Sequence, residues 1–181
     1  MQAAPSRSFA VRSARRGDVA HVQRLASEIW HLHYPGIIST AQIEYMLARG
    51  YSDQALQSYL DTPGAGLALA VLGSEDVGFV AWCRGEAPGV TRLDKLYVLP
   101  REHGQGIGRR LISHVEAAAR DDGATGLVLN VARRNERSIA AYRKCGFVVR
   151  EAQVADIGGG FSVDDYVMTK ALVLDAWEDL R

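Results

Sequence analysis

The amino-acid sequence predicts an α/β fold in which helices flank a mixed sheet. Segments with the two-residue period of strands alternate with segments of helical period along the whole chain, and a glycine-rich turn joins one strand directly to a helix. No internal repeat, low-complexity tract or linker divides the 181 residues. We therefore expect a disordered N-terminus at residues 1–8, a single domain over residues 9–172 and a C-terminal tail at residues 173–181.

The first half of the chain contains both kinds of segment. Residues 9–13 have the pattern of a short strand, and Asp18 is placed to cap a helix that buries one apolar face and ends at Trp30. Ser39 and Gln42 have the spacing of a capping box, which opens a second helix through Leu47. A third helix is expected at 53–60, before Pro63-Gly64. Strands at 67–72 and 77–83 flank the polar turn 73–76, and a further strand covers 92–98.

The second half predicts strand, glycine turn, helix, strand, helix and a final strand pair. Ile107, Leu111, Val115 and Ala118 recur at helical spacing, which indicates an amphipathic helix over 105–122 that Gly123 ends. The remaining expected elements are a strand at 127–131, a helix at 135–144, and strands at 147–155 and 161–170 joined across Gly158-Gly159-Gly160.

Composition restricts the partners and the compartment. The chain carries 21 basic and 21 acidic side chains, so its formal net charge is zero, and no run approaches the ~18 apolar residues of a membrane-spanning helix. We expect neither nucleic acid nor a membrane as a partner. Cys83 and Cys145 lie far apart, which favours a reducing, cytoplasmic location. His31 and His33 lack partners at zinc-like spacing, so no metal is expected.

The turn between the strand at 92–98 and the following helix could hold a diphosphate. Gly104, Gly106 and Gly108 are spaced by two at the helix N-terminus, where unpaired backbone N–H groups and the helix dipole favour an anion. A Walker A loop is excluded because Gly-Lys-Ser/Thr is absent, and a dinucleotide fingerprint is excluded because Arg109 stands where a third glycine is required. A purely structural turn remains the alternative.

A second set of polar residues lies one strand further on. Asn135, Ser138 and Tyr142 share one face of the helix at 135–144, so an amide, a hydroxyl and a phenol can line one groove. Alternatively, Tyr142 is a core aromatic and Asn135 an N-cap.

Together these segments resemble the GNAT superfamily of N-acetyltransferases. The resemblance is carried by Val98-Leu99-Pro100, by residues 103–108 and by residues 135–147, in the order and at the spacing typical of that superfamily. His103 departs from the Arg or Gln that the superfamily usually has there. Trp30, His33-Tyr34 and the segment 37–47 resemble the PaiA-type polyamine acetyltransferases.

The resemblance implies that acetyl-coenzyme A is the co-substrate and that an amine attacks its thioester directly. It implies Tyr142 as the general acid toward the thiolate and the Val98 N–H as the donor to the thioester oxygen. Lys144 is the first candidate for the 3′-phosphate. The full set of expected cofactor-binding residues is Leu96, Tyr97, Val98, His103, Gly104, Gln105, Gly106, Ile107, Gly108, Arg109, Asn130, Asn135, Ser138, Tyr142 and Lys144.

The general base is less clearly indicated. Asn130 stands where some relatives have a glutamate, and an amide cannot take a proton at neutral pH. Asp94, on the same strand face as Leu96, is one candidate, with a surface or paired carboxylate as the alternative. His33 and Tyr34 are the other candidates, as lining of the acceptor site or as a water relay.

The acceptor site is expected near Trp30, His33 and Tyr34. The first hypothesis for the acceptor is a small-molecule primary amine of polyamine type. The alternatives are an N-terminal or lysine amine of a protein or peptide, and an acyl-CoA-binding regulator without turnover. A homodimer is compatible with the sequence.

Overall fold

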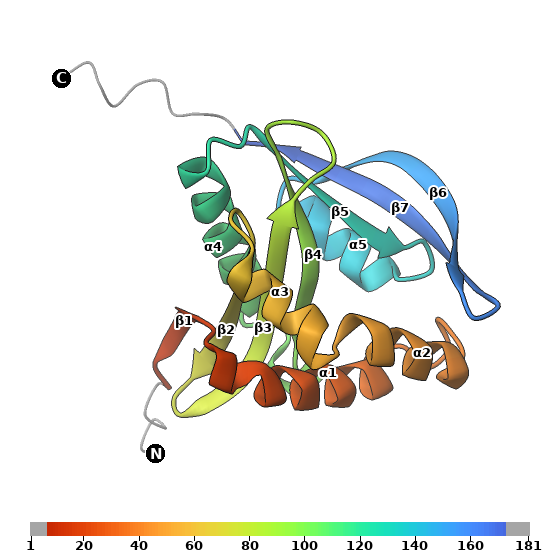
Figure 1. The fold of residues 1–181 in the computed structure, drawn as a ribbon, viewed down its shortest axis with the longest axis horizontal. Coiled ribbons are helices and arrows are strands. Elements are labelled where there is room, and N and C mark those ends of the chain that lie inside the picture. Colours follow the sequence, from red (N-terminus) through yellow and green to blue (C-terminus); the bar gives the residue numbers. More distant parts are fainter. Residues whose placement is uncertain (1–6, 173–181) are drawn as a thin grey trace.

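A mixed sheet of seven strands forms the centre of the protein (Figure 1). The computed structural model describes residues 7–172. The strands follow the order β1-β2-β3-β4-β5-β7-β6, and all neighbours are antiparallel except β4 and β5. Their bounds are β1 Phe9–Ser13, β2 Gly66–Leu72, β3 Glu75–Arg84, β4 Val90–Val98, β5 Gly126–Ala132, β6 Val148–Gly158 and β7 Phe161–Ala171. The predicted α/β class is confirmed.

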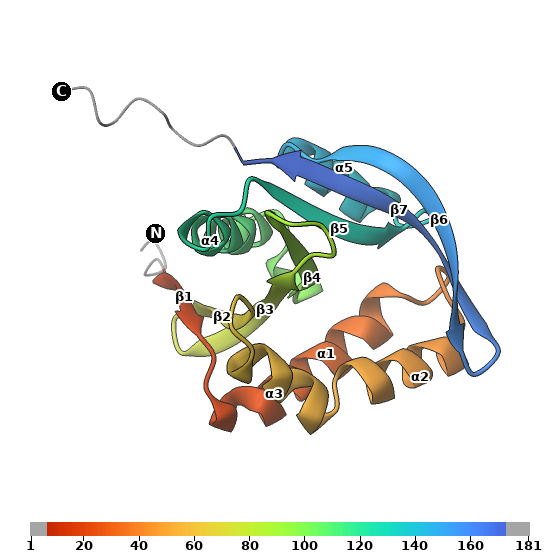
Figure 2. The same cartoon turned by 45° about the horizontal axis from the view of Figure 1, so that its top comes forward.

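The helices cover the two faces of the half-sheet β1–β4. Figure 2 shows α1 and α3 below these strands and α4 above them. Helix α4 buries Ile107, Leu111, Val115 and Ala119 against the sheet, so its apolar stripe lies as the sequence predicts except that Ala119 replaces Ala118. The bounds are α1 Val19–His33, α2 Thr40–Gly50, α3 Asp53–Asp61, α4 Ile107–Asp121 and α5 Glu136–Lys144. Within residues 7–172, no helix combines the length and the apolar character needed to cross a membrane.

Strands β4 and β5 separate after a short paired stretch. They pair only from Val90 with Gly126 to Arg92 with Val128, although β4 continues to Val98 and β5 to Ala132. A parallel strand left without its partner exposes one edge of backbone N–H and C=O groups. The sheet is therefore open between these strands, as Figure 1 shows.

The hairpin of β6 and β7 reaches back to α2 and closes the open side. Tyr45 donates a hydrogen bond from its hydroxyl to the Ile157 carbonyl at 2.8 Å, and Gln42 Nε2 donates to the Ser162 carbonyl at 2.9 Å. Gly159 at the hairpin tip has φ +65°, and a Cβ there would lie 2.6 Å from the Tyr45 ring. The glycine is thus required both by the turn and by the close approach of α2.

Several predicted details are wrong. Asp18 does not cap α1 through its side chain, because its carboxylate is bound by the Arg12 guanidinium at 2.8 and 3.0 Å and by the Arg15 backbone N–H. Helix α1 continues through His33 instead of ending at Trp30. Several strands are also longer than predicted, because sheet pairing extends them into their flanking turns.

The expected terminal segments fall largely outside the described residues. Of the segment 1–8, only Arg7 and Ser8 are described. The Ser8 carbonyl accepts a hydrogen bond from Gly73 N–H, and Arg7 pairs with Glu102. The expected tail at 173–181 lies wholly outside.

Candidate functional site

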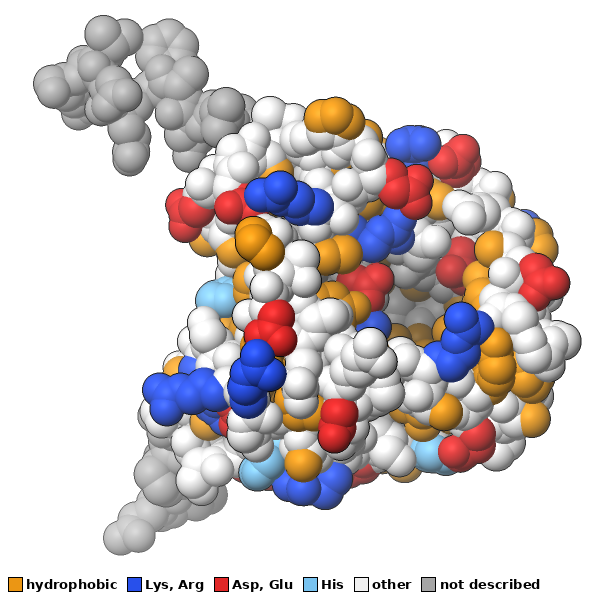
Figure 3. All heavy atoms as spheres, viewed as in Figure 1, with side chains coloured by type: hydrophobic (Ala, Val, Ile, Leu, Met, Phe, Trp, Pro, Cys, Tyr) orange, Lys and Arg blue, Asp and Glu red, His pale blue; other side chains and the backbone are white. Residues whose placement is uncertain are grey.

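A cavity of about 1000 Å³ lies where β4 and β5 separate. Figure 3 shows the surface hollowed there, with acidic and basic side chains at the rim. The cavity is lined from α1 and α2 on one side, from α4 and α5 on the other, and from β4, β5 and β7 between them. All the sequence-predicted site residues line it except Gln105, whose side chain instead donates to Glu102.

The glycine turn has the conformation that an anion site requires. Gly104 and Gly106 have φ of +85° and +77°, a region that side-chain-bearing residues rarely adopt. The first backbone hydrogen bond of α4 runs from Arg110 N–H to the Gly106 carbonyl. Among the described residues, no backbone acceptor is found for the N–H groups of residues 104–109, which are therefore free for a ligand.

The open edge of β4 presents the backbone of Val98. Leu99 N–H donates to the Val77 carbonyl of β3 at 2.9 Å, so strand alternation directs the N–H and C=O of Val98 the other way, toward the gap. His103 Nε2 donates to the Val98 carbonyl at 2.8 Å. The imidazole therefore contacts the strand edge, and the Val98 N–H remains available to an oxygen of a ligand.

Helix α5 contributes a cap and a phenol. Asn135 is only 5% exposed, and its Oδ1 accepts from the Ser138 backbone N–H, so the sequence-predicted N-cap is confirmed. Tyr142 lines the cavity and packs edge-on against Phe147 with ring centroids 5.8 Å apart. Burial raises the pKa of the Tyr142 phenol, so it keeps its proton at neutral pH.

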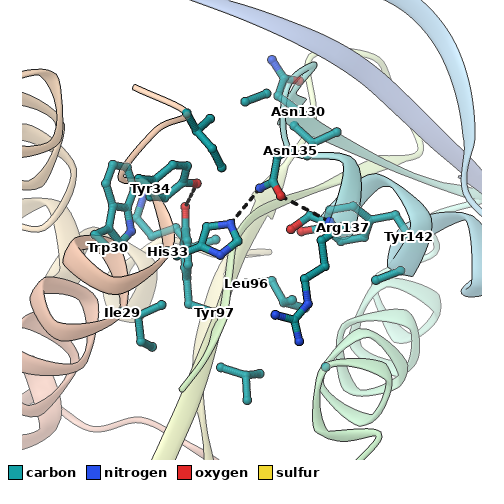
Figure 4. A pocket seen from close by; sticks show the side chains of 18 of the residues that line it. Ile29, Trp30, His33, Tyr34, Leu96, Tyr97, Asn130, Asn135, Arg137 and Tyr142 are labelled. Atoms are coloured by element: carbon teal, nitrogen blue, oxygen red, sulfur yellow. Dashed lines mark hydrogen bonds between the residues drawn. The ribbon is translucent and has the colours of Figure 1, made fainter. Parts of the chain in front are cut away.

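Aromatic side chains form the wall on the α1 side. Trp30 and Tyr34 lie with ring centroids 4.6 Å apart, and the hydroxyls of Tyr34 and Tyr97 are 3.2 Å apart (Figure 4). His33 stands beside Tyr34 and faces Asn135 from across the cavity, as Figure 4 also shows. The predicted cluster of Trp30, His33 and Tyr34 is thus brought together with β4 and α5.

Asp94 lines the cavity but is engaged by other side chains. It accepts hydrogen bonds from the Tyr59 hydroxyl and from Lys95 Nζ. The charge of Lys95 and the bond from Tyr59 lower the pKa of Asp94 in spite of its burial. The paired-carboxylate alternative therefore describes Asp94. Asn130 accepts from Arg92 Nη1 at 3.2 Å.

Sequence reasoning missed a further carboxylate in the cavity. Asp165 on β7 lines it, 35 residues beyond Asn130 in the chain. Burial and the neighbouring Asp164 raise the pKa of Asp165 to about 6. In the sequence, Asp165 stands among alternating strand residues without a motif, so only the pairing of β7 with β5 could have revealed it.

Basic residues gather on the α4 and α5 side. Arg109, Arg137 and Lys144 line the cavity, and Arg109 and Lys144 also border a smaller hollow of about 330 Å³. Free backbone N–H groups, guanidinium groups and an ammonium group are the donors that phosphates prefer. The donor set therefore fits the diphosphate of coenzyme A, with the open edge of β4 beside it for an extended amide chain. Within residues 7–172, no group of three or more His, Cys, Asp or Glu is placed to hold a metal ion.

Comparisons with known proteins agree with this architecture. The model of the acetyltransferase (GNAT) family matches residues 27–147, more than half of the chain. An uncharacterised N-acetyltransferase of Mycobacterium tuberculosis is 30% identical over 156 residues, covering 86% of this chain and 99% of the relative. The aminoglycoside N(6′)-acetyltransferase type 1 of Stenotrophomonas maltophilia is 32% identical over 109 residues, covering 56% of this chain and 71% of that protein.

One solved structure with a similar fold contains bound coenzyme A. The PaiA N-acetyltransferase of Thermoplasma acidophilum, solved in complex with coenzyme A, superposes with a TM-score of 0.77 at 25% identity. The match covers 91% of this chain and 99% of that one.

Proposed function

The chain belongs to the GNAT family and is an acetyl-CoA-dependent N-acetyltransferase, and from this premise we propose that its acceptor is the primary amine of a small, polyamine-like molecule. The observation that carries the proposal is the link between α2 and the β6–β7 hairpin, which bounds the cavity on one side. The contacts of Tyr45 with Ile157 and of Gln42 with Ser162 close α2 against the β6–β7 hairpin. A cavity bounded on this side suits a small amine better than an extended chain that would have to cross the link between α2 and the hairpin.

The charge and the walls of this end support the same class of acceptor. Asp165 supplies an acidic group, and Trp30, Tyr34 and Tyr97 supply aromatic faces that favour a cation or an aliphatic chain. The PaiA protein and the aminoglycoside acetyltransferase among the similar proteins are consistent with a small, amine-bearing acceptor.

We assign the binding of acetyl-CoA to the α4 and α5 side. Backbone N–H groups of residues 104–109 would hold the diphosphate, and Arg109, Arg137 and Lys144 would neutralise phosphate charge. Acetyl-CoA supplies the acetyl group as a thioester. Its chain would lie along the open edge of β4.

The reaction makes two demands that residues of this chain can meet. The Val98 N–H would stabilise the charge that develops on the thioester oxygen, with His103 holding the strand edge through the Val98 carbonyl. The Tyr142 hydroxyl would give its proton to the departing thiolate. Because its pKa is raised, the phenol is protonated throughout the working range, and its donation depends on close placement beside the sulfur.

The acceptor class is tested with a panel of amines and acetyl-CoA, by measuring release of the coenzyme A thiol. Spermidine, cadaverine, an aminoglycoside, free lysine and a lysine-containing peptide are suitable probes. We expect the highest kcat/KM with an aliphatic amine. Preference for the peptide would instead make the chain a protein acetyltransferase, and tight coenzyme A binding without turnover on a broad panel would favour the regulator.

A further inference from the structure

We propose that Asp165 is the residue that binds the ammonium group of the acceptor and accepts its proton before acetyl transfer. The inference rests on the proposed function, because it concerns the acceptor end of the same cavity.

Asp165 lines the cavity from β7, the strand that pairs with β5. Strand β7 is hydrogen-bonded between β5 and β6, and Asp165 lies opposite Ala132 of β5, which also lines the cavity. Burial and, to a smaller extent, the charge of Asp165 raise the pKa of Tyr34, whose hydroxyl lies 3.2 Å from that of Tyr97, the neighbour of Val98 on β4. Burial and, to a smaller extent, Tyr34 raise the pKa of Tyr142. Asp165 is therefore coupled to the cluster that surrounds the open edge of β4.

Asp165 differs from the other carboxylates that line the cavity in having no basic or hydrogen-bonding partner among the described residues. Four carboxylates line the cavity, and three of them are neutralised by partners on the protein. Glu102 is bound by Arg7 and Gln105, Asp94 by Lys95 and Tyr59, and Asp164 by Arg133. Among the described residues, no hydrogen bond or salt bridge reaches the carboxylate of Asp165. A half-buried carboxylate without a partner is costly to the fold, and an ammonium ligand would satisfy it.

The pKa of Asp165 suits a group that accepts a proton from the ammonium group of the acceptor. Its pKa of about 6 leaves the carboxylate mainly ionised at pH 7 and makes it roughly a hundredfold stronger as a base than an ordinary aspartate. The charged and titratable groups around it are Asp164 on its own strand, the Arg133 that pairs with Asp164, and Tyr34 from α1. Asp94 is the weaker base because its pKa is lowered.

The proton transfer balances without a further reactant. The acceptor enters as R–NH₃⁺ and gives one proton to the Asp165 carboxylate, which leaves R–NH₂ with a free electron pair. That pair forms the N–C bond to the acetyl carbon as the C–S bond breaks. Tyr142 gives its proton to the sulfur and recovers one from the nitrogen, and Asp165 releases its proton to solvent. The products are the acetamide, the coenzyme A thiol and one proton.

The assignment also defines the acceptor chemically. Because Asp165 is the single unneutralised carboxylate among the described residues that line the cavity, the site takes one ammonium group at the reacting end. The aromatic wall of Trp30, Tyr34 and Tyr97 then favours an aliphatic chain directly behind that group.

The test compares Asp165→Asn with Glu151→Gln as a control on β6, where the exposed Glu151 pairs with Arg150 and does not line the cavity. With the best amine of the panel, we expect Asp165→Asn to lower kcat/KM by about 10²-fold or more. Glu151→Gln should stay within about threefold of the wild type, and both variants should keep the wild-type Kd for coenzyme A. The acid limb of the wild-type kcat/KM profile, near pH 6, should disappear in Asp165→Asn. The acid limb should persist in His33→Gln. That result would assign the limb to the Asp165 carboxylate and not to the His33 imidazole.

A second readout does not depend on turnover. Because folding raises the pKa of Asp165 above that of an unfolded aspartate, the unfolded chain loses its proton first as the pH rises, so the destabilisation builds up between about pH 4 and pH 6 and is complete above about pH 6. Asp165→Asn should therefore melt at a higher temperature than the wild type at pH 8 and at the same temperature at pH 4.

The outcomes for Asp165 and for the acceptor class are distinguishable. Amine turnover by the wild type that Asp165→Asn leaves unchanged, or that Glu151→Gln lowers equally, overturns the role of Asp165 and leaves the proposed function standing. Turnover of the peptide alone overturns the small-amine acceptor, and an equal loss in Asp165→Asn with that peptide would still uphold the role of Asp165.

Discussion

Asn135 Nδ2 donates a hydrogen bond to His33 Nε2 at 3.0 Å across the cavity (Figure 4). The amide orientation is fixed because Oδ1 of the same side chain accepts from Ser138 N–H at the start of α5. The acceptor nitrogen of His33 therefore carries no proton, in agreement with burial lowering the pKa of His33. One buried amide thus joins the end of α1 to the first turn of α5, and both segments line the cavity.

The two bonds of Asn135 can be separated by substitution. Asn135→Ala removes both and should lower the free energy of unfolding by about 1–2 kcal/mol, the usual cost of a lost N-cap plus a weak hydrogen bond. Asn135→Ser keeps a capping oxygen and should cost less than Asn135→Ala. Urea denaturation measures both values. Equal losses in the two variants would mean that the cap contributes nothing here.

Tyr142→Phe removes only a hydroxyl. Among the described residues, no hydrogen bond to the Tyr142 hydroxyl is found, so the free energy of unfolding should change by less than about 0.5 kcal/mol. We expect kcat to fall by about 10²-fold, because the thiolate loses its proton donor, while the Kd for coenzyme A changes by less than about threefold. Tyr166→Phe, on β7 but outside the cavity lining, is the control and should keep full activity. A kcat unaffected by Tyr142→Phe would refute the assignment.

Gly106 and Gly123 provide a matched pair at the two ends of α4. Both have φ of +77°, and a Cβ at either position would meet no atom within 4 Å. Alanine should therefore strain both turns to a similar degree, by about 1–2 kcal/mol of unfolding free energy. Only Gly106→Ala should raise the Kd for coenzyme A, by about tenfold or more, because it alters the turn that presents the free N–H groups. Calorimetric titration of both variants measures the difference, and equal affinities would argue against binding at the turn.

Asp18 should make the stability depend on pH at the acid end. Its hydrogen bonds with Arg12 lower the pKa of Asp18 to about 2, below the value of an unfolded aspartate. As the pH falls, the unfolded chain therefore takes up the proton first, so the stabilisation is complete above about pH 4 and is lost between about pH 4 and pH 2.

Substitution of Asp18 tests this linkage. At pH 7, Asp18→Asn should lower the unfolding free energy by about 1–2 kcal/mol, allowing for the screening of the partly exposed Arg12. The loss should vanish near pH 2. Asp61→Asn, which removes an exposed pair with Arg16, should change stability by less than about 0.5 kcal/mol at either pH. A loss for Asp18→Asn that does not vary with pH would indicate packing instead of charge.

The sequence by itself determined the features that arise from local backbone chemistry. Gly104 and Gly106 indicate a turn with positive φ, the apolar spacing from Ile107 predicts α4, and Asn135 predicts the cap of α5. Each signal lies within a few residues of the structure that it predicts, since helical periodicity and capping act over about one turn.

Tertiary structure alone decided which polar side chains are free. Asp94 and Asp165 both stand on strands and both line the cavity. Tyr59, 35 residues before Asp94 in the chain, donates a hydrogen bond to Asp94, whereas within residues 7–172 no side chain does so to Asp165. Asp18 has the spacing of a cap, yet Arg12 on β1 takes its carboxylate. The separation of β4 from β5 brings these distant segments around one cavity. The charge state and reactivity of a carboxylate depend on groups within a few ångströms in space, and strand pairing, which joins residues far apart in the chain, determines which groups those are.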